Sequence, residues 1–197
     1  NIASGGTATV TNSTLSGNSA SNGGGGINNF GTATVTNSTL SGNTAGYGGG
    51  GIANGGTAEV TNSTLSGNTA GYGGGGIDNI WGSTAEVTNS TLSGNSASRG
   101  GGIYNYGTAT VTSSIVLGNN AVVNDEISGT VTNPSGLSII GGVNAANVFA
   151  ATTTDGAGVL ADNGGPVQTI ALNNDASNPA LDAGDDAAAT AAGADTD

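Results

Sequence analysis

The stretch GTATVTNSTLSGNTAGYGGGGIANG (31–55) decides the fold, because close copies of it precede and follow it in the chain. The copies are GTATVTNSTLSGNSASNGGGGINNF (6–30), GTAEVTNSTLSGNTAGYGGGGIDNI (56–80), STAEVTNSTLSGNSASRGGGIYNY (83–106) and the shorter GTATVTSSIVLGNN (107–120). Equivalent valines lie 25, 25, 27 and 24 residues apart, and the extra residues enter around Ile80–Ser83. Gly and β-branched residues dominate, and no helical stripe exists, so each copy predicts one coil of a β-solenoid.

Aligning the copies gives three columns of large aliphatic side chains. They are Val10, Val35, Val60, Val87 and Val111, then Leu15, Leu40, Leu65, Leu92 and Val116, then Ile2, Ile27, Ile52, Ile77 and Ile103. Each column predicts a short strand that points one side chain into a narrow interior. Ala8 and Ala20, with their equivalents, fill the remaining space.

Three columns of Asn separate the strands. They are Asn12, Asn37, Asn62 and Asn89, then Asn18, Asn43, Asn68, Asn95 and Asn119, then Asn29, Asn54, Asn79 and Asn105. Asn tolerates left-handed backbone, its amide satisfies turn groups, and identical stacked amides bond to one another. The columns therefore predict corners, and the Gly runs before each Ile supply a further tight corner.

The predicted fold is all-β, a right-handed parallel β-helix with about 25 residues and three short strands per coil. Residues 1–120 form its regular coils. Residues 121–197 form irregular coils and acidic loops of the same domain, with roughly three further coils and about eight in total.

Composition excludes several functions. The chain of 197 residues has no Cys, His or Met, its single basic residue is Arg99, and its formal net charge is −12. Disulfides, Cys/His zinc sites and Cys, His or Lys catalysis are therefore ruled out, and nucleic acid is not an expected partner because phosphate binding needs basic residues. No run approaches the ~20 apolar residues of a membrane helix. The chain begins at Asn1 without a visible signal peptide, and we interpret it as a processed piece of a longer precursor.

The GGGI-x-N and TVTNSTLSGNTA strings resemble the repeats of secreted bacterial β-helix proteins, including the polymorphic outer-membrane-protein type. The segment LADNGGPVQTIALNNDASNPALDAGDD (160–186) is similar to the terminal part of choice-of-anchor Q surface proteins, and SGTVTNPSGLSIIGG (128–142) to the coil before it. The resemblance implies an extracellular or cell-surface right-handed β-helix.

Two repeated motifs have alternative interpretations. GYGGGG (71–76) satisfies the G-x-G-x-x-G pattern of a nucleotide loop, which needs a helix after it, but the string recurs at 46–51 as a coil corner. The Asn residues at 12, 37, 62 and 89 each begin an N-S-T sequon. They are either glycosylation sites or, as we favour, structural residues of a turn.

Acidic residues offer only weak candidates for chemistry. Glu59 and Glu86 occupy equivalent outward positions, about 5 Å apart, and form either a solvated pair or a contact for Ca²⁺ or acid/base chemistry. Glycosidases need their carboxylates across a cleft, not on a flat sheet. Polysaccharide lyases of similar architecture need bases and cations, for which Arg99 is the lone candidate. We therefore predict no catalytic residues, no cofactor and no enzyme activity.

The acidic C-terminal loops are a further Ca²⁺ candidate, because Asp, Asn and Gly loops supply oxygen ligands. Their carboxylates belong to Asp162, Asp175, Asp182, Asp185 and Asp186. No known calcium motif is present, so solvated turns are the alternative.

Tyr47, Tyr72 and Arg99 fall at one corner of successive coils. An aromatic stack capped by a guanidinium binds sugar rings or merely stabilises itself.

Thirteen of the fifteen outward positions of the Val-bearing strands are Thr, with Glu59 and Glu86 as the exceptions. Such a grid, with spacings of about 6.6 by 4.8 Å, resembles ice-binding solenoids, while strand propensity alone also explains Thr there.

The leading expectation is a non-catalytic extracellular structural or adhesive solenoid. Open solenoid edges favour end-to-end self-association into filaments or a cell-surface stalk. A carbohydrate-binding or polysaccharide-cleaving β-helix, with surface carbohydrate as partner, is the alternative, followed by an ice-binding solenoid.

Overall fold

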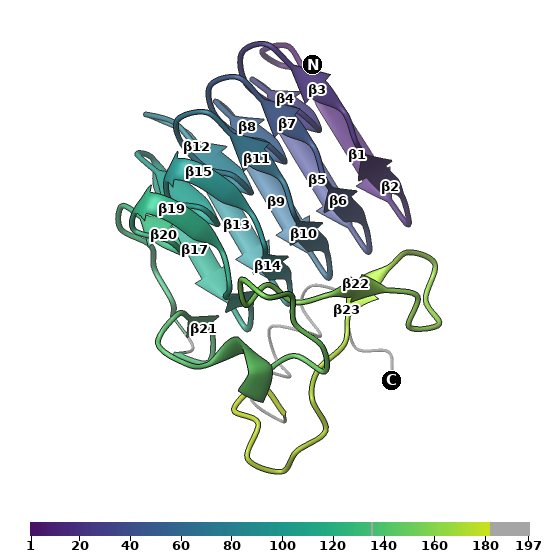
Figure 1. Ribbon diagram of the computed structural model, residues 1–197. Coiled ribbons are helices and arrows are strands. Elements are labelled where there is room, and N and C mark those ends of the chain that lie inside the picture. Colours follow the sequence, from purple (N-terminus) through teal and green to yellow (C-terminus); the bar gives the residue numbers. More distant parts are fainter. Residues whose placement is uncertain (135, 182–197) are drawn as a thin grey trace.

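The computed structural model describes residues 1–134 and 136–181, and in this part of the chain the repeats form about five turns of a parallel β-solenoid (Figure 1). Every turn contributes one strand to each of four parallel sheets, which run along the solenoid side by side. The three expected strands per turn carry the Val, Leu and Ile columns. A fourth short strand carries the small residues Ala20, Ala45 and Ala70.

We name the sheets after the residues that characterise them. The Thr sheet contains β1 (Thr7–Thr11), β5 (Thr32–Thr36), β9 (Thr57–Thr61), β13 (Thr84–Thr88) and β17 (Thr108–Thr112). The Leu sheet contains β2 (Thr14–Ser16), β6 (Thr39–Ser41), β10 (Thr64–Ser66), β14 (Thr91–Ser93), β18 (Ile115–Val116) and β21 (Ile139–Ile140). The Ala sheet contains β3 (Ser19–Ala20), β7 (Thr44–Ala45), β11 (Thr69–Ala70), β15 (Ser96–Arg99) and β19 (Asn120–Val123). The Ile sheet contains β4 (Ile27–Asn29), β8 (Ile52–Asn54), β12 (Ile77–Asn79), β16 (Ile103–Asn105) and β20 (Ile127–Ser128).

Equivalent residues of successive repeats are direct partners across the sheets. Val35 pairs with Val60, Leu40 with Leu65 and Ile52 with Ile77. These side chains are at most 1% exposed and belong to one continuous core inside the coils. The sequence prediction of a repeat-built aliphatic core is therefore confirmed.

The three Asn columns perform two different tasks. Asn12, Asn37, Asn62 and Asn89 adopt left-handed backbone, with φ of 48 to 49°, and turn the chain between the Thr and Leu sheets. The other two columns form amide ladders inside the solenoid, apart from Asn18 in the first coil, which is exposed. In one, Asn43 Nδ2 donates to Asn68 Oδ1 at 2.9 Å; in the other, Asn54 Nδ2 donates to Asn79 Oδ1 at 2.7 Å. These buried amides have no access to water, and each donates a hydrogen bond to the next amide along the solenoid axis instead.

The first ladder ends on a carboxylate. Asn119 Nδ2 has no further Asn to bond, and it donates to Glu126 Oε2 at 2.7 Å, while the backbone N–H of Gly118 donates to Glu126 Oε1 at 2.9 Å. Burial raises the pKa of Glu126, and these hydrogen bonds oppose that rise. The last amide of the ladder, that of Asn119, has a donor that needs an acceptor, and the carboxylate of Glu126 supplies one.

One member of the predicted Ile column is wrong. Ile2 bridges Asn29 instead of Ile27, so it covers the start of an Asn ladder. The cause is a longer connection: Ala3–Gly6 form a turn in which the Gly6 N–H donates to the Ala3 carbonyl at 2.8 Å and Gly5 has φ of +75°. This turn takes up two residues more than the corner at Phe30–Gly31.

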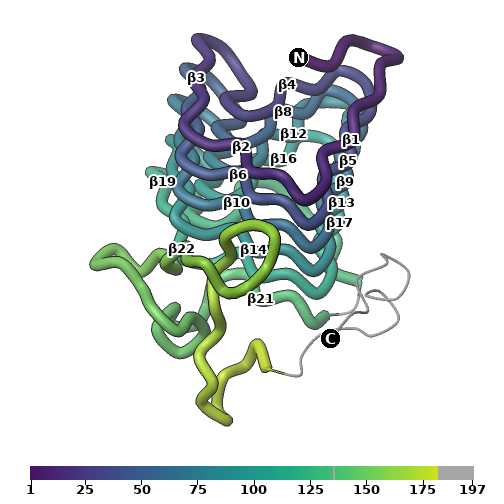
Figure 2. Tube along the Cα trace, turned by 90° about the vertical axis from the view of Figure 1, so that its right-hand side faces the viewer, coloured from purple at the N-terminus to yellow at the C-terminus, as the bar shows by residue number. Residues whose placement is uncertain are grey.

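The predicted three further coils after Asn120, and the total of about eight, are also wrong. The last solenoid strand is β21, after which the chain folds back along the outer side of the Leu sheet (Figures 1 and 2). This C-terminal arm holds a 3₁₀ turn at Ala145–Asn147 and the antiparallel strands β22 (Leu160–Ala161) and β23 (Thr169–Ile170). Within the described ranges, no helix is long and apolar enough to cross a membrane.

The fifth coil explains why the arm packs there. Where earlier coils present Thr and Ser outward from the Leu sheet, this coil presents Ile115 and Leu117. These side chains join Val148, Phe149 and Ile170 of the arm in a second apolar cluster. The arm also reaches earlier coils, because the Gly158 N–H donates to Ser93 Oγ at 2.9 Å.

A matched pair of substitutions tests the ladder. Asn68→Asp removes both donors, to Asn95 Oδ1 and the Leu40 carbonyl, and leaves a carboxylate among buried acceptors. We expect the free energy of unfolding to fall by about 3 kcal/mol or more. Asn62→Asp, six residues earlier, keeps a residue type that tolerates left-handed backbone, and we expect a loss under about 1 kcal/mol. Urea unfolding followed by circular dichroism measures both; equal losses would contradict the role of the ladder.

Candidate aromatic ligand site

A stack of rings runs along the corner that follows the Ala sheet. Tyr47 and Tyr72 occupy equivalent places in two coils, and their rings stack with centroids 5.0 Å apart and planes 12° apart. The Arg99 guanidinium, one coil further on, lies 5.4 Å from the centroid of the Tyr72 ring. The sequence prediction of a tyrosine stack capped by Arg99 is confirmed.

Two further tyrosines extend this stack. Tyr104 lies on the outward face of β16, and its ring meets Tyr72 edge-on at 5.9 Å and Tyr106 at 5.0 Å. All four tyrosines of the chain thus form one continuous group, the tyrosine cluster, of Tyr47, Tyr72, Tyr104 and Tyr106. Tyr104 is buried, whereas Tyr47 and Tyr106 are 59% and 56% exposed.

A glycine makes room for the buried ring. A Cβ on Gly73 would lie 2.4 Å from Cδ1 of Tyr104, so any side chain there would displace the ring. Burial raises the pKa of the Tyr104 phenol, and hydrogen bonds to Tyr106 and Tyr72 raise it further. Arg99 also hydrogen-bonds Tyr104; this bond raises the pKa of the guanidinium and lowers the pKa of the phenol, opposing the rise that burial causes.

A depression of about 370 Å³ opens beside the cluster. It is lined by Arg99, Tyr104, Asn105, Tyr106, Gly107, Ser128, Gly129 and Thr130. The pocket therefore combines aromatic faces, a single fixed cation and hydroxyl groups. Its lining has no aliphatic residue, so the tyrosine rings are its main apolar surfaces and the other side chains supply hydrogen-bonding groups.

Asp78 is a buried carboxylate in the same column of the Ile sheet as Tyr104. Its partners across the sheet are Ala53 and Tyr104, and a Cβ on Gly48 would lie against its Oδ2 atom. The side chain is 5% exposed, and desolvation raises its pKa to about 7. Asp78 and the Glu59–Glu86 pair lie on different sheets.

The repeated motifs turn out to be structural. Strand β12, not a helix, follows GYGGGG at 71–76, so this string is a coil corner. Its glycines permit close approach of neighbouring backbones: a Cβ on Gly75 would lie 2.5 Å from the backbone N of Ser96. The sequon asparagines are the left-handed corner residues described above.

The Thr face has the predicted alternation, with Ala and Val inside and Thr outside. Glu59 and Glu86 are register partners on it and both are exposed. The Thr34 hydroxyl donates to Glu59 Oε2 at 3.5 Å. The carboxylates thus interrupt the central Thr column, and ice binding stays a prediction.

The Ca²⁺ candidates are only partly described. Asp162 accepts from the Gly164 N–H at 3.1 Å, and Asp175 accepts from the Ser177 N–H at 2.8 Å, so both carboxylates close local turns. The hydrogen bonds from Ser177 lower the pKa of Asp175. Across residues 1–134 and 136–181, no three acidic residues gather at one point. Asp182, Asp185 and Asp186 lie outside the described residues.

Sequence reasoning missed Tyr104, Tyr106 and the burial of Asp78 next to Tyr104. A signal existed: the column after each core Ile reads Asn28, Ala53, Asp78, Tyr104 and Ser128, and it varies while its neighbours repeat. What the sequence did not reveal is that this column lies beside the Tyr47–Tyr72 corner.

No protein-family model, curated protein or solved structure matches this chain. The fold alone therefore defines its class, and that class is the parallel β-helix repeat proteins.

The buried carboxylate makes a pH-dependent prediction. Folding raises the pKa of Asp78 from 3.8 to about 7. The protonated carboxyl therefore stabilises the folded state at low pH, and this stabilisation is lost as the pH rises through 7. We expect Asp78→Asn to be more stable than the wild type at pH 8, by up to about 4 kcal/mol, and to lose this advantage near pH 4. Thermal unfolding across this range measures it. Glu59→Gln, which removes an exposed carboxylate from the Thr sheet, is the matched control, and a pH-independent effect of Asp78→Asn would contradict the assignment.

Proposed function

We propose that this chain is a non-catalytic adhesive β-solenoid, extracellular or at the cell surface, that binds neutral carbohydrate through the tyrosine cluster. The observation that carries this proposal is the continuous Tyr47–Tyr72–Tyr104–Tyr106 group beside the depression lined by Arg99, which we call the Arg99 pocket. The site is larger than the Tyr47–Tyr72–Arg99 stack expected from the sequence, because Tyr104, Tyr106 and the Arg99 pocket extend it.

The chemistry of the site fits a sugar. The apolar C–H face of a pyranose ring packs on an aromatic face, while its hydroxyls bond to groups at the rim such as Arg99 and Thr130. Exposed rings grouped on one side of a soluble protein mark an interaction surface. A net charge of −12 and one cation disfavour uronates and phosphates, and therefore favour a neutral saccharide.

The positions of the carboxylates support binding without cleavage. Hydrolysis of a glycosidic bond uses two carboxyl groups on either side of the bond. Asp78 lies between Ala53 and Tyr104 in its sheet, and the Glu59–Glu86 pair lies on the Thr sheet.

The resemblance of the repeat to secreted bacterial β-helix proteins supports the proposed location. Polymorphic outer-membrane-protein repeats and the choice-of-anchor Q type are the finer assignments that we propose from it. A surface protein of that kind presents its ligand site on a long, regular scaffold.

Removal of one central ring tests the function. Tyr72 contacts Tyr47, Tyr104 and Arg99, so Tyr72→Ala breaks the cluster. We expect the wild-type protein to bind at least one of cellohexaose, laminarihexaose and chitohexaose. Isothermal titration calorimetry should show that Tyr72→Ala binds the same sugar with an affinity lower by about tenfold or more. Glu59→Ala on the Thr sheet serves as control and binds as the wild type does. Absence of binding to all three sugars, or unchanged affinity in Tyr72→Ala, would refute the proposal.

Self-association end to end is a second, structural proposal. The strands β1 to β4 each pair with one neighbouring strand, and the next coils repeat them in register. Chains that stack through this edge would sediment as a series of multiples whose mean mass rises with protein concentration, and electron microscopy would show filaments. Monomers at every concentration tested would contradict stacking and leave carbohydrate binding unaffected.

A further inference from the structure

A two-residue insertion in the fourth coil builds a rigid turn that displays the only tryptophan of the chain. Residues Ile80–Ser83 form this turn: the Ser83 N–H donates to the Ile80 carbonyl at 3.2 Å, and Gly82 has φ of +80°. The buried Ser83 hydroxyl donates to Asn79 Oδ1 at 2.7 Å. The turn is therefore fastened to the internal Asn ladder.

The chain contains the same turn without tryptophan. Ala3–Gly6 have the matching hydrogen bond, and Gly5 has a matching positive φ, but Ser4 stands where the second turn has Trp81. The turn itself consequently needs no aromatic residue at that place. Trp81 is 83% exposed, so the interior of the protein does not need it either.

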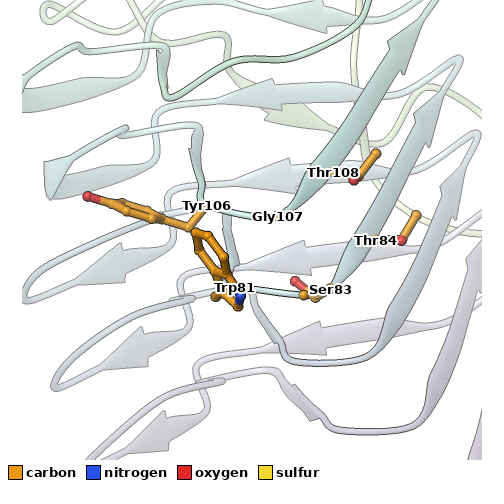
Figure 3. A pocket seen from close by; sticks show the side chains of 7 residues that line it. Trp81, Ser83, Thr84, Tyr106, Gly107 and Thr108 are labelled. Carbon is orange, nitrogen blue, oxygen red and sulfur yellow. The ribbon is translucent and has the colours of Figure 1, made fainter.

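The indole lies beside Tyr106, where a depression of about 340 Å³ opens (Figure 3). Its lining consists of Trp81, Gly82, Ser83, Thr84, Tyr106, Gly107 and Thr108. Tyr106 and Gly107 also line the Arg99 pocket, so the two depressions meet at Tyr106.

We infer that the Trp81–Tyr106 pocket is a second carbohydrate subsite, which takes one neutral sugar ring of an oligosaccharide whose other rings occupy the tyrosine cluster. This inference rests on the proposed function and adds a separate site to it. Trp81 provides the stacking face, and Thr84 and Thr108 provide hydroxyls at the edge of the Thr sheet.

The lining favours a sugar over a second copy of the chain. All seven residues are uncharged: two are aromatic, three carry Ser or Thr hydroxyls and two are glycines. A stable protein interface needs a much larger area, on the order of 800 Å² from each partner. A single exposed indole with hydroxyls around it matches one ring of a polyol instead.

The single tryptophan gives the experiment a reporter at the site, because all indole emission comes from Trp81. Cellohexaose, laminarihexaose and chitohexaose, with their disaccharides, are titrated into the full chain while fluorescence and heat are followed. The variants are Trp81→Ser, which copies the natural turn at Ser4; Trp81→Phe, which keeps a ring; and Tyr72→Ala.

We expect a bound hexasaccharide to shift or quench the indole emission. Trp81→Ser should weaken hexasaccharide binding about tenfold, leave disaccharide binding at the tyrosine cluster unchanged, and be largely rescued in Trp81→Phe. Binding that depends on Tyr72 but leaves the emission and the Trp81→Ser affinity unchanged would overturn the subsite and preserve the proposed function. Failure of every sugar to bind would overturn both, and an emission shift that depends only on protein concentration would assign the pocket to a second copy.

Discussion

The buried amide ladder is the interaction on which the rest of the solenoid depends. An Asn amide both donates and accepts, so an identical amide that the next coil places directly above it satisfies part of its hydrogen-bonding capacity inside the solenoid. Asn43, Asn68 and Asn95 are stacked in this way through steps of 25 and 27 residues. The ladder therefore fixes the register of every strand, and the aliphatic columns and the stacked tyrosines follow from that register.

The same narrow interior determines where large side chains go. Gly50, Gly51 and Gly76 come so close to neighbouring backbone that even a methyl group would collide, and the core accepts at most one large aliphatic residue per strand. Of the seven aromatic residues, Phe149 alone is buried among apolar residues of the C-terminal arm, and the others lie in or beside the corners of the coils. A fold with no room for rings inside is suited to presenting them outside.

The repeat was sufficient to predict the coils, the aliphatic columns and the Tyr47–Tyr72–Arg99 stack, because equivalent positions in a solenoid must be neighbours. It could not place Ile2, whose position depends on the length of one turn, nor the C-terminal arm, whose contacts join residues such as Ser93 and Gly158. Ile115 and Leu117 carried a usable signal, since two outward apolar residues require a cover. Tyr104 was missed because its neighbour Tyr72 belongs to a different strand column.

Departures from the repeat are informative because repetition alone satisfies the fold. Where the outward column of the Ile sheet changes from Asn28 to Ala53, Asp78 and Tyr104, the ladder and core beside it do not change. The turn at Ile80–Ser83 likewise has a counterpart that manages with Ser4. Tyr106 and Trp81 are exposed, so stability places little demand on the residue type at these positions, and they lie with Tyr104 on one side. We propose that contact with a ligand, a requirement other than folding, is the reason that they gather there.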